Sequence, residues 1–338
     1  MRKGLNPHKD KQQEKSEFIH QVIIPVYIPN QQGYFKDSFR ILQICLESLF
    51  KTAHSKTFIS VIDNGSSNEI KEYLDSLFTS QKIHEVIHTA NIGKLNSIVK
   101  GLVGNNIELV TISDSDVFFL ENWQNETVKI FNAFPKAGVV GVVPQFRVFS
   151  HLCGNLISEN FFSKKLKFTE VKNPEAMKKF FHSIWGEDSF NPVHLKWNLT
   201  IENKKDIAVV GSGHFVATYK KSIFQETRTY FDFKMGADTE KYLDEMPLKK
   251  GLWRLTTNDN YAYHMGNAFE DWMQETLDKI APNNVKPEIL LPTRDVKDSS
   301  KIDYFTKNRL FMKFFSNKTV RRFFYKIKGL PKDEIANY

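Results

Sequence analysis

The chain has 338 residues, 41% of them hydrophobic and 25% charged, which is the composition of a globular protein with a large core. The only two cysteines, Cys45 and Cys153, exclude a disulfide framework and a thiolate metal site, and they favour a reducing compartment. The net charge of +8 suits nucleic acid, an anionic membrane or a polyanionic substrate, so its distribution has to decide among them.

The amino-terminal residues 1–17 are polar and charged, which predicts a disordered arm. They contain no apolar segment of the kind found in signal peptides, and no apolar run in the chain approaches the length of a membrane span. The basic residues of the arm are not interleaved with aromatic side chains that could stack on bases. Nucleic acid is therefore not an expected partner.

From residue 18 onward, apolar strand-like runs alternate with segments of helical period. We expect strands at 22–27, 58–62 and 83–88 and helices at 37–50, 69–78 and 91–102. Each connection is long enough for a crossover between parallel strands. The pattern predicts an α/β fold with a mostly parallel sheet that is covered by helices on both faces.

A fourth apolar run, residues 107–112, ends at two carboxylates, Asp114 and Asp116. Alternating strand residues point to opposite faces, but two acids one residue apart can converge where the strand breaks into a turn. Mg²⁺ and Mn²⁺ take oxygen ligands and often pair carboxylates with substrate phosphates. The carboxyl ends of parallel strands share one edge, where Tyr27 and Asp63 would also lie. A plain polar turn is the alternative, since Asp and Ser are common in turns.

Four segments of this half resemble, in order and spacing, the landmarks of family 2 glycosyltransferases with the Rossmann-like GT-A fold: 22–27 (VIIPVY), 61–66 (VIDNGS), 91–94 (NIGK) and 114–116 (DSD). The resemblance covers about residues 20–270. It implies that Asp63 contacts the nucleotide base, Asp114 the ribose side and Asp116 a cation, Mn²⁺ or Mg²⁺. The full set of donor-binding residues that it implies is Pro25, Tyr27, Asp63, Asn91, Lys94, Asp114, Ser115 and Gly213.

Two other α/β enzyme classes do not fit the first strand. Sugar-1-phosphate nucleotidyltransferases have a glycine-rich phosphate loop there, which Pro25-Val26-Tyr27 does not resemble. A dinucleotide-binding dehydrogenase would need G-x-G-x-x-G at the first turn, and the sequence lacks it.

A further strand is expected at 138–143, and an irregular amphipathic region follows it. We interpret about 150–205 as an insert on the acceptor side. Glu187 and Asp188 within it are candidate catalytic acids, although a solvated charged loop is the favoured interpretation. Residues 207–220 then read as a strand, a glycine turn and a second strand, in which Gly213 resembles the turn beneath the donor sugar. His214 after it would contact an acceptor or be a packed core histidine.

The resemblance places the catalytic base near residue 238, usually as the second of two adjacent acids. Here Ala237 stands in the first position and Asp238 in the second, so we assign the base to Asp238. Glu240 is the competing acid on the acceptor side, and either carboxylate could instead favour the start of a helix. The strand that ends at His264 resembles the element that supplies a further metal ligand.

The carboxyl-terminal residues 286–338 form a basic extension with amphipathic helices. On a helical wheel Val320, Phe323, Phe324 and Ile327 fall on one face, and Arg321, Arg322, Lys326 and Lys328 on the other. Such a helix can lie in an anionic membrane interface. It can equally pack on the catalytic domain with a basic outer face. The sequence leaves both interpretations open.

Taken together, the resemblance implies a metal-dependent, inverting glycosyltransferase with a catalytic domain at 18–285. It would transfer a hexosyl or N-acetylhexosaminyl group, with a UDP-sugar as the expected donor, to a hydroxyl of a glycan or lipid-linked acceptor. The Q-x-x-R-W element of processive synthases is absent, so repeated chain extension is not expected. We expect a cytoplasmic protein, peripheral on the inner face of the membrane if the extension binds lipid. The alternative is a non-catalytic module of the same fold that binds sugar nucleotides or membrane.

Overall fold

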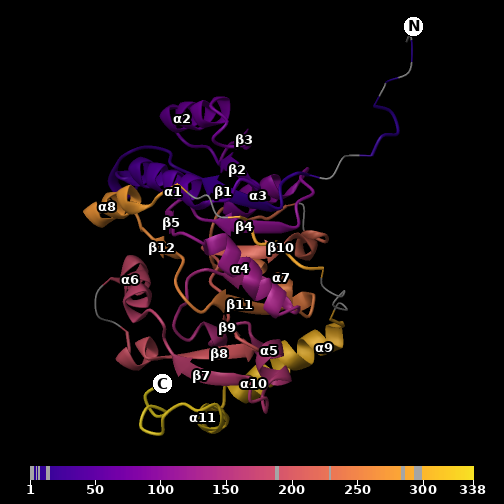
Figure 1. Ribbon diagram of the computed structural model, residues 1–338, viewed down its shortest axis with the longest axis vertical. Helices are drawn as coiled ribbons and strands as arrows, with labels where there is room; N and C mark the ends of the chain where they lie inside the picture. The colour runs from indigo at the N-terminus through magenta and orange to yellow at the C-terminus, as the bar shows by residue number, and fades with distance from the viewer. Residues whose placement is uncertain are drawn as a thin grey trace.

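The computed structural model describes residues 4, 6, 8–12, 16–186, 190–227, 230–282, 286–292 and 299–338, without the side chains of 237–240 (Figure 1). Its centre is a ten-stranded sheet with the strand order β3-β2-β1-β4-β10-β6-β11-β9-β8-β7. These strands are β1 (His20–Val26), β2 (Thr57–Asp63), β3 (Glu85–His88), β4 (Leu109–Ser113), β6 (Ala137–Gly141), β7 (Leu166–Glu170), β8 (Trp197–Asn203), β9 (Asp206–Val210), β10 (Val216–Lys220) and β11 (Trp253–Thr257). A second, two-stranded sheet pairs β5 (Val117–Phe119) with β12 (Ala262–His264).

The sheet is mixed but runs mainly in one direction. Strands β3, β2, β1 and β4 pair in parallel, and β6 with β11 do the same, whereas β10, β9 and β7 run antiparallel to their neighbours. Seven of the ten strands in the described sheet therefore point the same way. The predicted mostly parallel α/β architecture is confirmed.

Helices lie along both faces of the sheet (Figure 1). They are α1 (Ser38–Thr52), α2 (Asn68–Thr79), α3 (Lys94–Leu102), α4 (Trp123–Ala133), α5 (Gly154–Glu159), α6 (Pro174–Trp185), α7 (Ala237–Lys249), α8 (Asp271–Lys279), α9 (Lys301–Phe305), α10 (Phe311–Phe315) and α11 (Lys318–Ile327). Because strand side chains alternate, Val22 and Ile24 pack with α1 and α2, while Ile23 packs with α3 and α7. Both faces are buried, which explains why the parallel strands read as continuous apolar runs.

The region of the expected insert is more regular than its sequence indicated. Strands β7 and β8 pair antiparallel and extend the central sheet at its edge, and α6 lies between them in the chain. The first expected strands and helices agree with the structure within a few residues. Of the expected arm at 1–17, the described residues are all exposed, and Glu187 and Asp188 lie outside the described residues.

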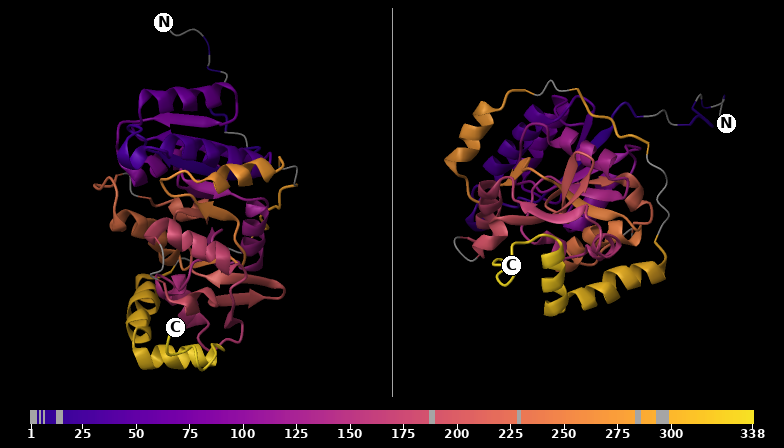
Figure 2. Two further views of the ribbon diagram at one scale, coloured as in Figure 1. Left: turned by 90° about the vertical axis from the view of Figure 1, so that its left-hand side faces the viewer. Right: turned by 60° about the horizontal axis from the view of Figure 1, so that its bottom comes forward.

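The carboxyl-terminal helices pack at the end of the molecule opposite β3 (Figures 1 and 2). Phe315, Phe324 and Tyr325 are buried in a core cluster with residues of β7 and β8. The expected division of α11 differs from the structure at Lys328, which is buried with its Nζ donating to the carbonyls of Asn160 and Ser163. Of the apolar face, Phe324 is buried, whereas Phe323 and Ile327 are exposed.

Among the described residues, no helix combines the length and the hydrophobicity that crossing a bilayer requires.

Candidate active site

A pocket of about 510 Å³ opens at the carboxyl ends of β1 and β4. Six of the predicted donor-binding residues line it, together with the predicted metal ligand Asp116: Pro25, Tyr27, Asn91, Lys94, Asp114 and Ser115. The edge position agrees with where open α/β sheets bind ligands. The structure thus brings together residues that are up to 91 positions apart in the chain.

Backbone hydrogen bonds fix the turn that carries the two carboxylates. The N–H of Asp114 donates to the carbonyl of Phe215 at 2.7 Å, just beyond the glycine turn at 211–213. The carbonyl of Asp116 accepts from the N–H of Met265 at 2.8 Å, just beyond β12. Because strand β4 ends at Ser113 and β5 begins at Val117, both acids lie in the turn and reach the same pocket.

A lysine from α3 neutralises the first carboxylate. The Nζ of Lys94 lies 2.5 Å from Oδ1 of Asp114, and both side chains remain partly exposed to the pocket. The N–H of Lys94 donates to the carbonyl of Lys234, which holds the loop before α7 against the start of α3. Gly93 permits this approach, since its φ is +92° and an added Cβ would lie 2.7 Å from Cα of Lys234.

The second carboxylate pairs with the predicted metal-ligand histidine. Oδ2 of Asp116 lies 3.4 Å from Nε2 of His264, and Oδ1 is buried with no hydrogen-bond partner among the described residues. Burial raises the pKa of Asp116 and the Asp114 carboxylate adds to the rise, while His264 and Lys94 oppose it. An unpartnered oxygen and an imidazole nitrogen this close suit a shared divalent cation.

Neighbouring side chains fix the orientation of the His264 ring. Its Nδ1 lies 3.0 Å from Oγ of Ser183 on α6, and the rings of Phe180 and Phe215 meet it edge-on. No cluster of three or more His, Cys, Asp or Glu side chains that could hold a metal occurs within the described residues. Asp116 and His264 could supply two ligands to a divalent cation, and Mg²⁺ sites commonly complete such a pair with water and other oxygen ligands.

Aromatic side chains that the sequence analysis missed form another wall of the pocket. Tyr34 and Phe35 line it beside Tyr27, whose ring meets that of Phe35 at 5.9 Å and 89°. Asn267 donates from Nδ2 to the carbonyl of Tyr34 at 3.2 Å and ties this loop to the segment after β12. The signal was the pair of aromatic residues that follows Gly33 in the loop after the first strand.

Asp63 does not line the pocket but is buried next to it. The carboxylate is fully buried, accepts from the N–H of Ser66 at 2.7 Å, and lies 2.9 Å from Nδ1 of His88. Its neighbour Asn64 lines the pocket instead, with Oδ1 accepting from the N–H of Ile92. A direct contact between Asp63 and a base therefore stays a prediction, and the structure shows Asp63 shaping the turn.

The remaining predicted residues lie on α7 and the glycine turn. Asp238 and Glu240 belong to the first turn of α7, directly after pocket-lining Met235, but their side chains are outside the described part of the chain. Gly213 and His214 do not line the pocket. Their predicted contacts with donor and acceptor stay predictions, as does the choice of Asp238 over Glu240.

His214 instead belongs to a polar cluster that the sequence did not indicate. Its Nδ1 lies 3.4 Å from Oδ2 of Asp244 on α7, and Oδ1 of Asp244 lies 2.6 Å from Nη2 of Arg254 on β11. Arg254 is buried and also donates to the carbonyls of His151 and Ser212. The cluster ties α7 to the glycine turn and to the sheet.

A second pocket, of about 620 Å³, has His264 in its lining. It is enclosed by α6, β12 and the start of α8, and its lining includes Lys178, Lys179, His182, Ser183, Tyr263 and Trp272. The Nζ of Lys179 lies 3.0 Å from the centre of the Trp272 ring and 4.7 Å from that of Tyr263. Burial lowers the pKa of Lys179 to about 8.

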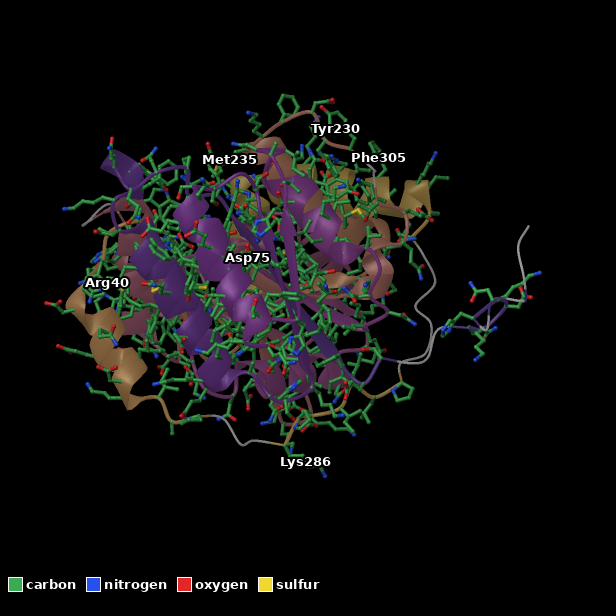
Figure 3. All side chains as sticks on the ribbon, turned by 90° about the horizontal axis from the view of Figure 1, so that it is seen from above. Arg40, Asp75, Tyr230, Met235, Lys286 and Phe305 are labelled. Atoms are coloured by element: carbon green, nitrogen blue, oxygen red, sulfur yellow. The ribbon has the colours of Figure 1, made fainter. Side chains whose placement is uncertain are left out.

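Figure 3 shows the side chains from above. Tyr230 and Met235, from the loop before α7, lie along one side of the molecule together with Phe305 of α9, and Lys286 lies on the opposite side. Met235 lines the first pocket, so this side carries one of its walls.

Comparison with known proteins shows which family this chain belongs to. The model of the family described as Glycosyl transferase family 2 matches residues 22–191, which is half of the chain. A comparison with curated protein sequences finds no match.

Solved structures resemble the chain at low identity. TarS 1–349 of S. aureus has a TM-score of 0.44 at 14% identity, with 73% of this chain and 60% of that chain covered. The same protein in complex with UDP-GlcNAc has a TM-score of 0.46 at 14% identity, with 89% and 74% covered. Mannosyltransferase PcManGT from Pyrobaculum calidifontis, in complex with GDP-Man and Mn²⁺, has a TM-score of 0.44 at 12% identity, with 92% and 72% covered. In the first of these matches, less than two thirds of the other protein is covered.

The four segments that carried the resemblance all lie within the matched residues 22–191. Asp238 and His264 lie beyond them, so their roles depend on their positions in the fold. The expected GT-A architecture, a large mainly parallel sheet flanked by helices, is confirmed. Since the family model matches half of its length, the chain belongs to glycosyl transferase family 2.

Proposed function

We propose that the protein is a metal-dependent glycosyltransferase that moves a sugar from a nucleoside diphosphate sugar to an acceptor hydroxyl, with inversion at the anomeric carbon. One observation carries the proposal: Tyr27, Lys94, Asp114 and Asp116 converge in one pocket, and His264 closes against Asp116. A planar base, a sugar and a diphosphate need, respectively, aromatic contact, hydrogen-bond acceptors and positive charge. This pocket offers all three.

The donor would lie along the edge of the sheet. Tyr27, Tyr34 and Phe35 offer ring edges and faces to a base, and uracil is the one we propose. Asp114 and Ser115 would accept hydrogen bonds from the ribose. Asp116 and His264 would hold Mn²⁺ or Mg²⁺, because Oδ1 of Asp116 is unpartnered among the described residues and both ligand types suit these ions. A cation bound there would neutralise charge that develops on the leaving diphosphate.

The catalytic base that deprotonates the acceptor would come from α7. The loop before this helix supplies Lys234 and Met235 to the pocket, so the first turn of α7 begins beside it. We assign the deprotonation of the acceptor hydroxyl to Asp238, with Glu240 as the competing residue. A hydroxyl on the far side of the sugar from the diphosphate would then be the attacking group, which gives inversion.

The second pocket is the proposed acceptor site. His264 lines this pocket, and its Nε2 lies 3.4 Å from Oδ2 of Asp116, which lines the donor pocket, so a molecule bound there would lie near the proposed metal site. Tyr263 and Trp272 supply aromatic surface with Lys179 lying over their rings, and Lys178, His182 and Ser183 add polar groups. This mixture suits a glycan or a lipid-linked glycan. The cytoplasm is the proposed compartment, because both cysteines are free and buried.

A panel of nucleotide sugars tests the function. The protein is incubated with each sugar and Mn²⁺, Mg²⁺ or EDTA, and released nucleotide and the melting temperature are recorded. We expect a UDP-sugar to be hydrolysed slowly, and UDP to raise the melting temperature more with metal than with EDTA. Asp116→Ala should lose that metal-dependent increment, while Asp278→Ala, an exposed carboxylate on α8, should keep it.

Each alternative has its own outcome. Metal-dependent binding without turnover of any sugar would identify a non-catalytic sugar-nucleotide-binding module. An increment that survives Asp116→Ala would show that the acidic turn is not a ligand site. Once an acceptor is found, the configuration of the new glycosidic bond, read by NMR from the anomeric proton, tests inversion.

A further inference from the structure

The net positive charge of the protein is concentrated at its carboxyl terminus. Residues 301–338 contain ten Lys and Arg against three Asp and Glu, a net charge of +7. The other 300 residues contain 37 Lys and Arg against 36 Asp and Glu. The basic character of the chain, +8 in total, is therefore a property of this segment and not of the catalytic body.

The same segment exposes large apolar side chains. We define the C-terminal surface by six of them, each between 41% and 77% exposed: Ile302, Phe305, Leu310, Phe314, Phe323 and Ile327. Six exposed cations lie among them in the chain: Lys301, Arg309, Lys313, Lys318, Arg322 and Lys326. A single exposed apolar residue needs no explanation, but six within 26 positions of one segment do.

A π-helical turn at Thr306–Leu310 lies between α9 and α10 and changes which of their residues share a face. At about 100° per residue, Leu310 and Phe314 would lie about 80° and 120° from Ile302 on an uninterrupted α-helix. The i→i+5 bonding takes one additional residue into the turn and so sets the following residues back by about 100°. Phe314, which follows the turn, then falls within about 20° of Ile302, and Phe305 lies within about 60°.

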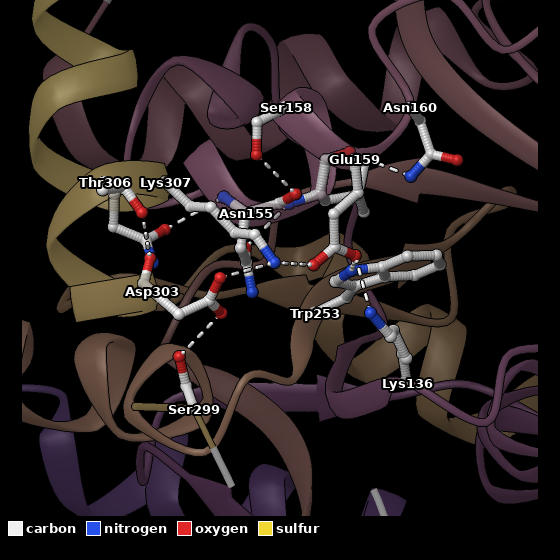
Figure 4. A network of polar contacts seen from close by, with 12 residues as sticks. Lys136, Asn155, Ser158, Glu159, Asn160, Trp253, Ser299, Asp303, Thr306 and Lys307 are labelled. Carbon is white, nitrogen blue, oxygen red and sulfur yellow. Dashed lines mark hydrogen bonds and ion pairs between the residues drawn. The ribbon is translucent and has the colours of Figure 1, made fainter. Parts of the chain in front are cut away.

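The helices that carry the C-terminal surface are fixed to the body of the protein (Figure 4). Glu159 of α5 accepts from Nζ of Lys307 at 2.9 Å, from Nζ of Lys136 at 2.8 Å and from Nε1 of Trp253 at 3.0 Å. Lys307 also lies 3.0 Å from Oδ1 of Asp303. On α11, Phe324 and Tyr325 are buried, so the outward position of Phe323 is set by packing.

The cations of this surface are available to a partner. Among the described residues, no carboxylate lies within ion-pair distance of Lys301, Lys313, Lys318, Arg322 or Lys326. Arg309 is the exception, since its Nη2 lies 3.3 Å from Oε1 of Glu245. Unpaired cations beside exposed aromatic rings match a surface that offers negative charge and an apolar layer beneath it.

We propose that the C-terminal surface binds an anionic lipid bilayer, with the cations at the headgroups and the apolar side chains in the interface. A soluble polyanion would use the cations but gain nothing from Ile302, Phe305 or Phe314, so the exposed apolar residues favour lipid. The inference does not depend on the proposed function, because it uses none of the pocket residues.

Co-sedimentation of the full chain with vesicles tests the proposal. One set is pure phosphatidylcholine, and the other contains about one third phosphatidylglycerol, which gives the negative surface that attracts Lys and Arg. We expect binding to the anionic vesicles at low salt, much less at high salt, and little binding to the neutral vesicles. Lys318→Gln, Arg322→Gln and Lys326→Gln together should weaken binding by about a hundred-fold, since each charge near an anionic surface contributes about five-fold.

Two further variants separate charge from apolar contact. Phe314→Ser, Phe323→Ser and Ile327→Ser together should weaken binding to anionic vesicles with all cations retained. The matched control is Lys56→Gln, Lys100→Gln and Lys205→Gln, which removes the same charge from exposed sites elsewhere and should leave binding unchanged. Unaltered melting temperatures establish that each variant is folded.

Several results would overturn the proposal. They are no vesicle binding by the parent at low salt, equal loss in the control variant, or an apolar variant that binds as the parent does. Heparin binding as tight as vesicle binding and insensitive to the apolar variant would identify a polyanion site. Self-association abolished by the apolar variant, without vesicle binding, would identify an interface between copies of the chain.

Discussion

Asp114 and Asp116 are one residue apart and have different electrostatic surroundings. Asp114 faces a cation, Lys94, at 2.5 Å, whereas Asp116 faces an imidazole at 3.4 Å and keeps one oxygen unpartnered among the described residues. Burial raises the pKa of Asp116, so the ionised form is disfavoured until positive charge arrives. A divalent cation provides that charge, which is why we assign the metal to Asp116 and not to Asp114.

Lys94 offers the first test at this scale. Lys94→Met removes the charge beside Asp114 while it keeps much of the side-chain length, so the pocket becomes more negative. We expect the Kd of UDP, measured by calorimetry with Mn²⁺ present, to rise about tenfold or more, because a charge-assisted contact contributes roughly 1.5–3 kcal/mol. Lys94→Arg keeps the positive charge and should therefore weaken UDP binding less. An unchanged Kd in Lys94→Met would mean that Lys94 only orders Asp114 and does not meet the diphosphate.

The catalytic base is a second residue-scale test. Asp238→Asn keeps the shape but removes proton acceptance, so we expect transfer to fall by about 10²-fold or more. Donor binding should remain close to that of the parent. Glu240→Gln is the matched control in the same helical turn. A larger loss from Glu240→Gln than from Asp238→Asn would reverse the assignment, and loss of donor affinity in Asp238→Asn would make Asp238 a donor ligand or a structural residue.

At the scale of elements, α7 connects the proposed base to the sheet through Asp244 and Arg254. Asp244→Ala leaves the buried guanidinium of Arg254 without its carboxylate partner, although two carbonyls still accept from it. We expect about 3 kcal/mol of lost stability by urea unfolding, the lower end of the range for a broken buried ion pair. Asp244→Leu combined with Arg254→Met should restore part of the lost stability, because no unpaired charge is then buried. Equal loss in the single and double variants would show that packing, not charge, governs this junction.

Helix α8 gives a test of the acceptor site. Trp272 forms a wall of the second pocket, away from the donor pocket. Trp272→Ala should raise the KM for the acceptor by about tenfold, the usual effect of losing an aromatic contact of 1–1.5 kcal/mol. Hydrolysis of the donor in the absence of acceptor should stay unchanged. A parallel loss of donor hydrolysis would place the acceptor elsewhere and make Trp272 a structural residue.

The sequence predicted the elements that are buried on both faces, and it predicted less well the elements that are half exposed. Strands β1, β2 and β4 read as continuous apolar runs because helices cover both sides, and their ends placed Tyr27 and Asp114 correctly. Strand β7 was missed because its outward residues are partly exposed and its apolar pattern is short. Tyr34 and the Asp244–Arg254 pair were missed because contacts between distant segments leave no local pattern.

The amphipathic pattern of α11 does not show which residues of each face are buried. The wheel grouped Phe323 with Phe324, yet packing buries Phe324 and Lys328 and turns Phe323 outward. A lysine can be buried when its ammonium group meets backbone carbonyls, here those of Asn160 and Ser163, and burial lowers the pKa of Lys328 to about 8. A helical wheel sorts side chains by polarity alone, whereas burial depends on which side chains pack against the neighbouring elements.

For the whole molecule, acid stability depends on two buried histidines. His20 on β1 and His54 after α1 lie with ring centres 6.2 Å apart, and His20 also meets the Trp123 ring edge-on. Burial and the neighbouring His54 lower the pKa of His20 to about 3, and burial lowers that of His54 to about 4. Both values lie below 6.5, the ordinary value for a histidine in an unfolded chain.

Below pH 6.5 the unfolded chain therefore binds two protons that the folded protein does not, so stability falls as the pH falls. The slope should approach about 1.4 kcal/mol per pH unit for each histidine near pH 5, where the unfolded chain is protonated at both histidines and the folded protein is not, in addition to what other groups contribute. Urea unfolding at stepped pH measures it. His20→Leu removes one of the two groups, and the difference in free energy of unfolding between parent and variant should change by about 1.4 kcal/mol per unit. His8→Leu, in the exposed arm, is the control, and its free energy of unfolding should change with pH as that of the parent does. If that of His20→Leu did so too, His20 would be protonated in the folded protein, and its hydrogen bond with Thr111 would have to be one that an imidazolium donates.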